Sequence, residues 1–80
     1  MNKLILHEIG KNILTNIHSW IVTVISTEGS TPGKIGSKIL INASGDITGT
    51  IGGGGIEKRV IDKIMQEKPR NVVKWNFDLG

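Results

Sequence analysis

The chain of 80 residues lacks cysteine and tyrosine and holds only two tryptophans, one phenylalanine and two prolines. Without cysteine it forms no disulfide and offers no thiolate to a metal ion, so noncovalent packing alone must hold the fold together. The scarcity of aromatics also leaves little for nucleic-acid bases to stack on. The ten lysines and arginines are scattered and form no basic run, so a net charge of +3 does not indicate a nucleic-acid partner.

Long hydrophobic runs are absent as well. The apolar stretches are about three residues long, as at positions 4–6 and 39–41, whereas a membrane-spanning helix needs about 20. The first residues do not show the basic start, apolar stretch and small-residue cleavage site of a signal peptide. We therefore expect a cytoplasmic protein that makes no membrane contact.

A mass of 8.7 kDa predicts a single domain covering residues 1–80. In so small a domain, the stabilisation from burying apolar surface barely exceeds the entropy lost on folding. We therefore expect the chain to associate with itself or to pack on a partner.

Hydrophobic spacing predicts an amphipathic helix over residues 2–15, weakened by Gly10 in its middle. Residues 20–27 are β-branched and apolar almost throughout, which is typical of a buried central strand. Residues 38–42 and 47–51 read as two short strands, and the four residues between them contain the Gly and Asp of a hairpin connection.

A second helix is expected over residues 56–65, where apolar residues form a stripe, and Pro69 lies beyond its end. Residues 72–77 then predict a final strand. The element order is α-β-β-β-α-β. It predicts an α+β fold in which a small, mostly antiparallel sheet packs with two helices.

Four consecutive glycines, Gly52 to Gly55, connect the third strand to the second helix. Glycines at this place let the backbone approach a ligand, and the N–H groups of the helix start attract anions. The spacing fits neither a dinucleotide fingerprint, because Glu57 stands where glycine is needed, nor a P-loop, because Gly55 stands where lysine is needed. An anion-binding turn and a tight crossing that packs the helix on the sheet both remain open.

Residues 28–38 form a second glycine-bearing segment with hydroxyls and two lysines. Such a loop can wrap an anion, or it can be an ordinary surface connection. Catalytic groups are few: His7 and His18 have no metal-site spacing, and no carboxylates pair as an acid and a base. We expect no catalytic residues, no metal site and no enzyme activity.

Two longer motifs resemble those of the XdhC/CoxI family. Residues 22–37, with the core STEGSTP at 26–32, precede an apolar strand as in the family's opening motif. Residues 45–57, GDITGTIGGGGIE, resemble its second motif, G-x-[IL]-x-G-T-[IV]-[SG]-G-G-C-[VL]-E. Both motifs keep the family's order and spacing, and with the flanking helices the resemblance covers nearly the whole chain.

The resemblance implies an accessory factor for a molybdenum hydroxylase such as xanthine dehydrogenase. Such a factor binds the molybdenum cofactor (molybdopterin), protects or matures it, and delivers it to the apo-enzyme. Typical members dimerise and carry a C-terminal Rossmann-like domain, so we expect a homodimer of N-terminal domains without that second domain. The expected partners are the apo-enzyme and a separate Rossmann-domain subunit. The cofactor-binding positions that follow from the two motifs are Ser30, Thr31, Lys34, Gly52, Gly53, Gly54, Gly55 and Glu57.

The sequence departs from the family pattern at two positions. Gly55 stands where the family has a cysteine, and Gly33 stands where an arginine often follows the proline. Sulfur ligation of molybdenum by this chain is therefore excluded, whereas backbone N–H groups at the glycines can still receive the molybdopterin phosphate. Glu57 either holds the turn, as its place near a helix start favours, or contacts the pterin. The alternative function is a non-catalytic docking subunit that has lost cofactor binding.

Overall fold

The computed structural model describes residues 2–25 and 35–77. Within these ranges the chain forms two helices and a three-stranded antiparallel sheet, so the predicted α+β fold is confirmed. The elements are α1 (Lys3–Leu14), β1 (Ser19–Thr23), β2 (Lys38–Asn42), β3 (Ile47–Gly49) and α2 (Gly54–Glu67).

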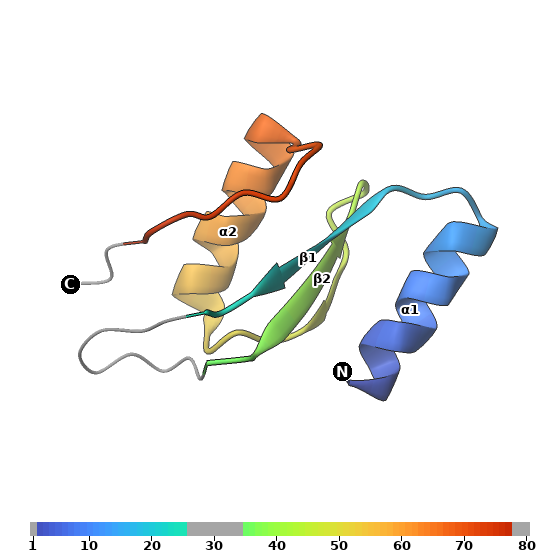
Figure 1. Cartoon of the computed structure of the whole chain (residues 1–80), viewed down its shortest axis with the longest axis horizontal. Helices are drawn as coiled ribbons and strands as arrows, with labels where there is room; N and C mark the ends of the chain where they lie inside the picture. The colour runs from blue at the N-terminus through green and yellow to red at the C-terminus, as the bar shows by residue number, and fades with distance from the viewer. Residues whose placement is uncertain (1, 26–34, 78–80) are drawn as a thin grey trace.

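The sheet lies between the two helices (Figure 1). Side chains alternate along β2, so that Ile39 and Ile41 face α2 while Leu40 faces α1, and all three are buried. The larger core is on the α2 side. It consists of Ile39, Ile41, Ile51, Val60 and Ile64, with Trp20 and Val22 packed against it.

The strand order β1-β2-β3 corrects one prediction. Residues 20–27 were expected to form a central strand, but β2 is central and β1 is an edge of the described sheet. The described residues cover one face of β1 better than the other: Trp20 and Val22 pack on the core, whereas Ile21 between them is 44% exposed. An edge strand that keeps apolar residues on its open face has the same composition as a central strand, which is why the pattern misled.

The helix predicted at residues 2–15 is present as α1, and both of its ends are capped. The Asn2 side chain accepts the N–H of Leu4 at 2.7 Å, and the Thr15 hydroxyl donates to the Lys11 carbonyl at 2.8 Å. Ile5 and Asn12, seven residues apart, are buried against the sheet. α1 packs on β2 and β3.

The predicted hairpin joins β2 to β3. Asn42 stabilises its turn by accepting the N–H groups of Ser44 at 2.9 Å and Asp46 at 3.1 Å. β3 ends at Gly49 rather than at residue 51. Gly49 has φ +93°, and a Cβ there would lie 2.6 Å from the Lys38 carbonyl oxygen. Backbone geometry therefore requires glycine where the strand turns away.

The prediction of a strand at residues 72–77 is wrong. No strand forms in this segment, which runs back along α2 (Figure 1). Trp75 and Phe77 alternate as predicted, but they pack beside α2, with the Lys63 ammonium 5.1 Å and the Arg59 guanidinium 5.5 Å from the ring centroids. These contacts hold the backbone of residues 72–77 against α2. The N–H and C=O groups of this segment therefore do not lie along a sheet edge.

The start of the same C-terminal segment is tied to β1. The indole N–H of Trp20 donates to the Pro69 carbonyl at 2.9 Å, which links residues 49 positions apart. Among the described residues, neither helix has the length and apolar character needed to span a membrane.

Candidate functional site: the glycine turn at the start of α2

The four glycines divide into two pairs with different roles. Gly52 and Gly53 have φ values of +133° and +153°, a region that side-chain-bearing residues rarely adopt, and they turn the chain from the buried Ile51 into α2. Gly53 is the N-cap residue. The conformation of the turn therefore explains why this first pair is glycine.

Gly54 and Gly55 are the first two residues of α2, which begins two residues earlier than the predicted Ile56. A Cβ added at either position would meet no atom within 4 Å in the described parts of the chain. A tight crossing on the sheet is therefore not what these two glycines provide there. Because glycine is the least favourable helix residue after proline, local folding does not explain them.

Gly54 and Gly55 expose backbone donors. The first N–H groups of a helix have no intrahelical acceptor, and the N-cap residue of α2, Gly53, has no side chain that could accept them. Both glycines are exposed, and the N–H groups of a helix start lie at the positive end of the helix dipole. The arrangement can donate two short-range hydrogen bonds to an oxyanion.

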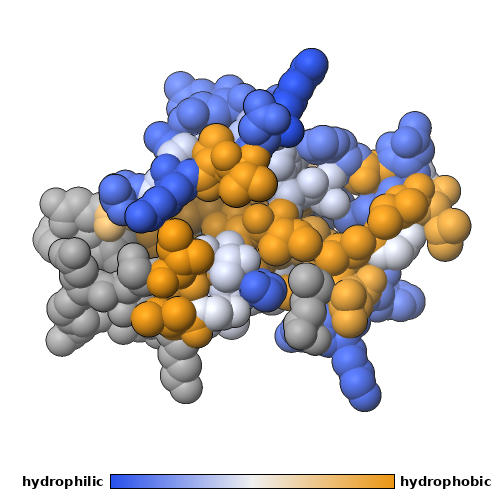
Figure 2. Space-filling view, in the orientation of Figure 1, coloured by the Kyte–Doolittle hydropathy of each residue, from blue (hydrophilic) through white to orange (hydrophobic). Residues whose placement is uncertain are grey.

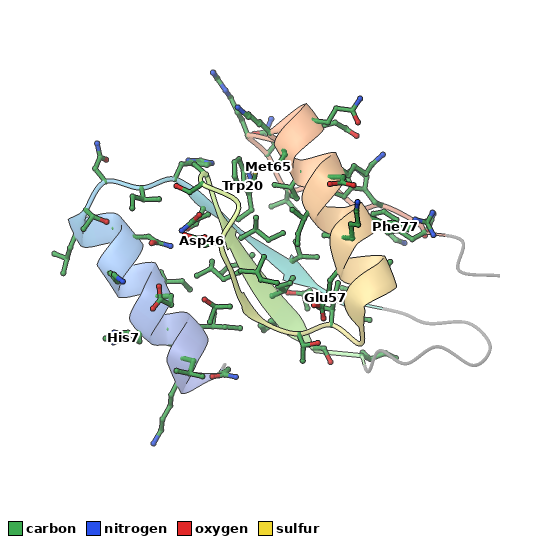
Figure 3. All side chains as sticks on the ribbon, turned by 180° about the vertical axis from the view of Figure 1, so that it is seen from behind. His7, Trp20, Asp46, Glu57, Met65 and Phe77 are labelled. Carbon is green, nitrogen blue, oxygen red and sulfur yellow. The ribbon has the colours of Figure 1, made fainter. Side chains whose placement is uncertain are left out.

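Glu57 lies near the start of helix α2 and holds the glycine turn in place. Its carboxylate accepts hydrogen bonds from the Thr50 hydroxyl and, at 3.1 Å, from the Ile51 N–H. Thr50 in turn accepts the Gly52 N–H at 3.3 Å. Figure 3 shows Glu57 at the lower end of α2, beside the connection from the sheet. Glu57 therefore makes the contacts that the first of its two predicted roles requires, and contact with the pterin stays a prediction.

These hydrogen bonds keep Glu57 ionised. The Thr50 hydroxyl lowers the pKa of the carboxyl most, and the N–H groups of Ile51, Gly53 and Gly52 lower it further, against the opposing effect of burial. The negative charge occupies the inner side of the glycine turn. An external anion is therefore left with the outer donors, those of Gly54 and Gly55.

The other predicted site residues, Ser30, Thr31 and Lys34, lie outside the described residues, and their roles stay predictions.

Sequence reasoning missed Thr50, the main hydrogen-bond partner of Glu57. Thr50 and Glu57 are seven residues apart across a turn, so neither helical nor strand periodicity links them. The position of Thr50 inside the second motif was the one sequence feature that pointed to it. In the described part of the chain, no three His, Asp or Glu side chains gather as a metal ion would require.

A sequence profile of the XdhC and CoxI family matches residues 15–74. The chain belongs to this family. The match includes the sheet, the glycine turn and α2, but not α1.

A curated relative is "Uncharacterized protein YqeB" of Escherichia coli (strain K12), which is 41% identical over 51 residues. The aligned part covers 59% of this chain but only 9% of that protein, so the chain spans a small part of the relative's length. No solved structure matches the chain.

Gly55 occupies the position at which the family motif has a cysteine, and the structure shows its surroundings. Gly55 is exposed, its backbone is helical, and the space around a side chain there is open among the described residues. The position can therefore hold a cysteine without rearrangement of its described surroundings. Compared with the cysteine of the family motif, glycine at position 55 therefore changes the available side-chain chemistry and not the backbone.

Proposed function

We propose that this chain is an accessory module for a molybdenum hydroxylase of the xanthine dehydrogenase type, and that the start of α2 binds the molybdenum cofactor through its phosphate. The observation that carries the proposal is the pair Gly54 and Gly55. They lie in a helix that would be more stable with other residues, and the space in front of them is open in the described part of the chain. Close approach of a ligand to the backbone accounts for both facts.

The residues present fit the phosphate of the cofactor. The N–H groups of Gly54 and Gly55 are donors of the kind that phosphate groups accept at helix starts. In the same proposal, Ser30 and Thr31 add hydroxyl donors and Lys34 adds a positive charge. The cofactor, when bound, supplies the redox centre of the target enzyme, whereas this chain supplies only recognition.

Glu57 shapes this recognition by its charge. Its ionised carboxylate lies just behind the donors, so the local field does not strongly favour anions. Affinity then depends on directed hydrogen bonds and on contacts with the pterin rather than on net charge. We infer that the site prefers the whole cofactor to free phosphate.

The proposed recipient of the cofactor is the apo-enzyme of the molybdenum hydroxylase. Family membership and the absence of any cysteine support an accessory rather than a catalytic role. A Rossmann-domain subunit is proposed as a second partner, because typical family members pair such a domain with this one. A docking role without cofactor remains the alternative.

An amide NMR titration of the labelled chain tests the proposal. Anaerobically released molybdenum cofactor is the ligand, and inorganic phosphate at the same concentration is the control. We expect shifts at residues 52–57 and 29–38 that saturate at lower concentration with the cofactor than with phosphate. Equal responses to the two ligands, or no shifts in a folded sample, would overturn the proposal in favour of the docking role.

A further inference from the structure

Polar and charged residues gather in a hollow between α1 and the hairpin that joins β2 to β3. The hollow has a volume of about 160 Å³, and its polar lining consists of Glu8, Lys11, Asn12, Asn42, Asp46 and Thr48. Leu40 and Ile17 add apolar surface to the lining. The face of the molecule drawn in Figure 2 differs in kind, since a band of apolar residues crosses it. The hollow therefore concentrates hydrogen-bonding groups that the glycine turn does not use.

Asn12 contributes a buried amide that the described residues leave unpaired. The residue is 4% exposed, and within residues 2–25 and 35–77 its side chain makes no hydrogen bond. Its backbone carbonyl is used instead, because it accepts the Ile17 N–H at 2.7 Å. No side-chain nitrogen or oxygen in these ranges is both sealed from solvent and unpaired, so the Asn12 amide still reaches the hollow. A buried amide of this kind costs stability unless a group from outside the chain pairs with it.

The hairpin directs its polar groups to the same side of the sheet. Leu40 faces α1, and Thr48 is its partner in the register of β2 and β3, so Thr48 shares that face. Asn42 and Asp46 each lie two residues from one of these positions, which places them on the same face. The Asn42 side-chain oxygen accepts the N–H groups of Ser44 and Asp46, so its NH₂ group is left to donate. Figure 3 shows Asp46 at the hairpin, on the side nearer to α1.

The hollow holds charges of both signs that the described residues leave unpaired. Glu8 lies three residues before Lys11 and four before Asn12, so the three share one flank of α1. In the described part of the chain, neither the Lys11 ammonium nor the carboxylates of Glu8 and Asp46 take part in an ion pair. A ligand with a single charge would leave the opposite charge of the hollow unmatched. The lining therefore favours a ligand that carries a positive and a negative group together.

We propose that the hollow binds a small zwitterion, namely an α-amino acid with a short side chain. The carboxylates of Glu8 and Asp46 receive its ammonium group, and the Lys11 ammonium receives its carboxylate. The Asn12 amide serves both groups, since its oxygen accepts from the ammonium and its NH₂ group donates to the carboxylate. The volume agrees with this size, because benzene occupies a protein cavity of about 150 Å³ and L-alanine has the same number of non-hydrogen atoms.

This site is separate from the glycine turn. It lies on the α1 side of the sheet, whereas the glycine turn begins α2 on the other side (Figure 1). Glu8, Lys11 and Asn12 also lie outside the family match at residues 15–74. The proposal therefore does not depend on cofactor binding, and either one can fail while the other holds.

An amide NMR titration of the labelled full chain with L-alanine tests the proposal. Propionate lacks the ammonium group and ethylammonium lacks the carboxylate, so these two are the control ligands. We expect L-alanine to bind with a dissociation constant of about 1 mM or lower, a modest affinity for a ligand of its size. Shifts should gather at residues 8–12 and 42–48 and not at 52–57. Each control ligand should bind at least about tenfold more weakly, because it leaves one sign of charge unpaired.

Two results of this titration would overturn the proposal. One is the absence of shifts at about 50 mM L-alanine, which is far above the expected dissociation constant. The other is equal binding of L-alanine and either control ligand, since the hollow would then not read both charges.

A pair of matched variants locates the site. Asp46→Asn removes one carboxylate of the hollow, and Asp62→Asn makes the same change at an exposed position of α2. We expect Asp46→Asn to weaken L-alanine binding about fivefold or more and Asp62→Asn to leave it unchanged. Equal affinities for these two variants would contradict a site at the hairpin.

Asn12→Leu separates a binding role from a structural one. Leucine is close to asparagine in size and needs no hydrogen bond, so the variant should unfold about 4 °C or more above the unmodified chain. L-Alanine binding should weaken at least about tenfold in the same variant. Thermal unfolding followed by circular dichroism and the same titration measure the two effects. A lower unfolding temperature would show that the amide serves the fold, and retained binding would show that it does not touch the ligand; either result would overturn the proposal.

Discussion

The hydroxyl of Thr50 donates a hydrogen bond to the carboxylate of Glu57, seven residues later and on the far side of the glycine turn. The same carboxylate accepts the Ile51 N–H, so one side chain of α2 holds the end of the sheet connection in place. The turn therefore has a fixed inner side, made by Glu57, and an open outer side, made by the N–H groups of Gly54 and Gly55.

Replacement of Glu57 by glutamine is expected to destabilise the chain by about 1 kcal/mol at pH 7, because the amide keeps an acceptor but loses the charge that the helix start favours. Hydrogen bonds hold the folded pKa of Glu57 below its ordinary value of 4.5. This contribution is fully present above about pH 4.5 and is lost as the pH falls through the folded pKa. Urea unfolding at pH 7 and at low pH measures the difference.

Glu67→Gln is the control for that experiment. Glu67 pairs with Lys63 at 3.0 Å on the exposed side of α2, where an ion pair contributes only about 0.3–0.5 kcal/mol. A loss for Glu57→Gln that equals the loss for Glu67→Gln, or that persists unchanged at low pH, would contradict the role assigned to Glu57.

Gly49→Ala is expected to cost about 2–3 kcal/mol, because the new methyl group would lie 2.6 Å from the Lys38 carbonyl oxygen and 3.1 Å from Ile5 at a φ of +93°. Gly45→Ala isolates the effect of positive φ, since its φ is +88° but the space around it is open; it should cost about 1 kcal/mol. Thermal unfolding of both variants measures the two effects. Equal losses would show that Gly49 does not approach Lys38 and Ile5 as closely as described.

Gly55→Cys introduces the residue that the family motif has at this position. We expect the variant to be at least as stable as the unmodified chain, because cysteine is a better helix residue than glycine and its side chain meets only open space among the described residues. The thiol should react fully with a disulfide reagent in the folded state. A thiol that reacts only after unfolding, or a loss of stability above 1 kcal/mol, would contradict the open geometry at Gly55.

The sequence predicted those elements whose signals are local. The Asn42 to Asp46 turn, helix α1 and helix α2 each follow from residues a few positions apart, although α2 starts at Gly54 and not at the predicted residue 56. The strand expected at residues 72–77 failed because alternation shows which side chains share a face, but not whether that face meets a sheet or a helix. The central position expected for residues 20–27 failed because β1 keeps Ile21 on an open face.

The candidate site was predictable in part. Motif spacing identified the glycines and Glu57, but it could not distinguish the two pairs of glycines. The turn requires glycine at Gly52 and Gly53, but it does not require glycine at Gly54 and Gly55. That division depends on φ angles and on the space around each Cβ. The link from Thr50 to Glu57 also needs the folded turn, because only the reversal of the chain brings the two side chains together.

Cofactor binding at the glycine turn is tested most directly by measuring the affinity of the Gly54→Val variant for anaerobically released molybdenum cofactor. Valine fits the open space at this helical position and is a better helix residue than glycine, so the chain should fold while its side chain blocks the outer N–H groups. Gln66→Val, an exposed substitution near the other end of α2, is the control. We predict at least a tenfold loss of affinity for Gly54→Val and none for Gln66→Val. Unchanged affinity in a folded Gly54→Val chain would contradict cofactor binding at the glycine turn.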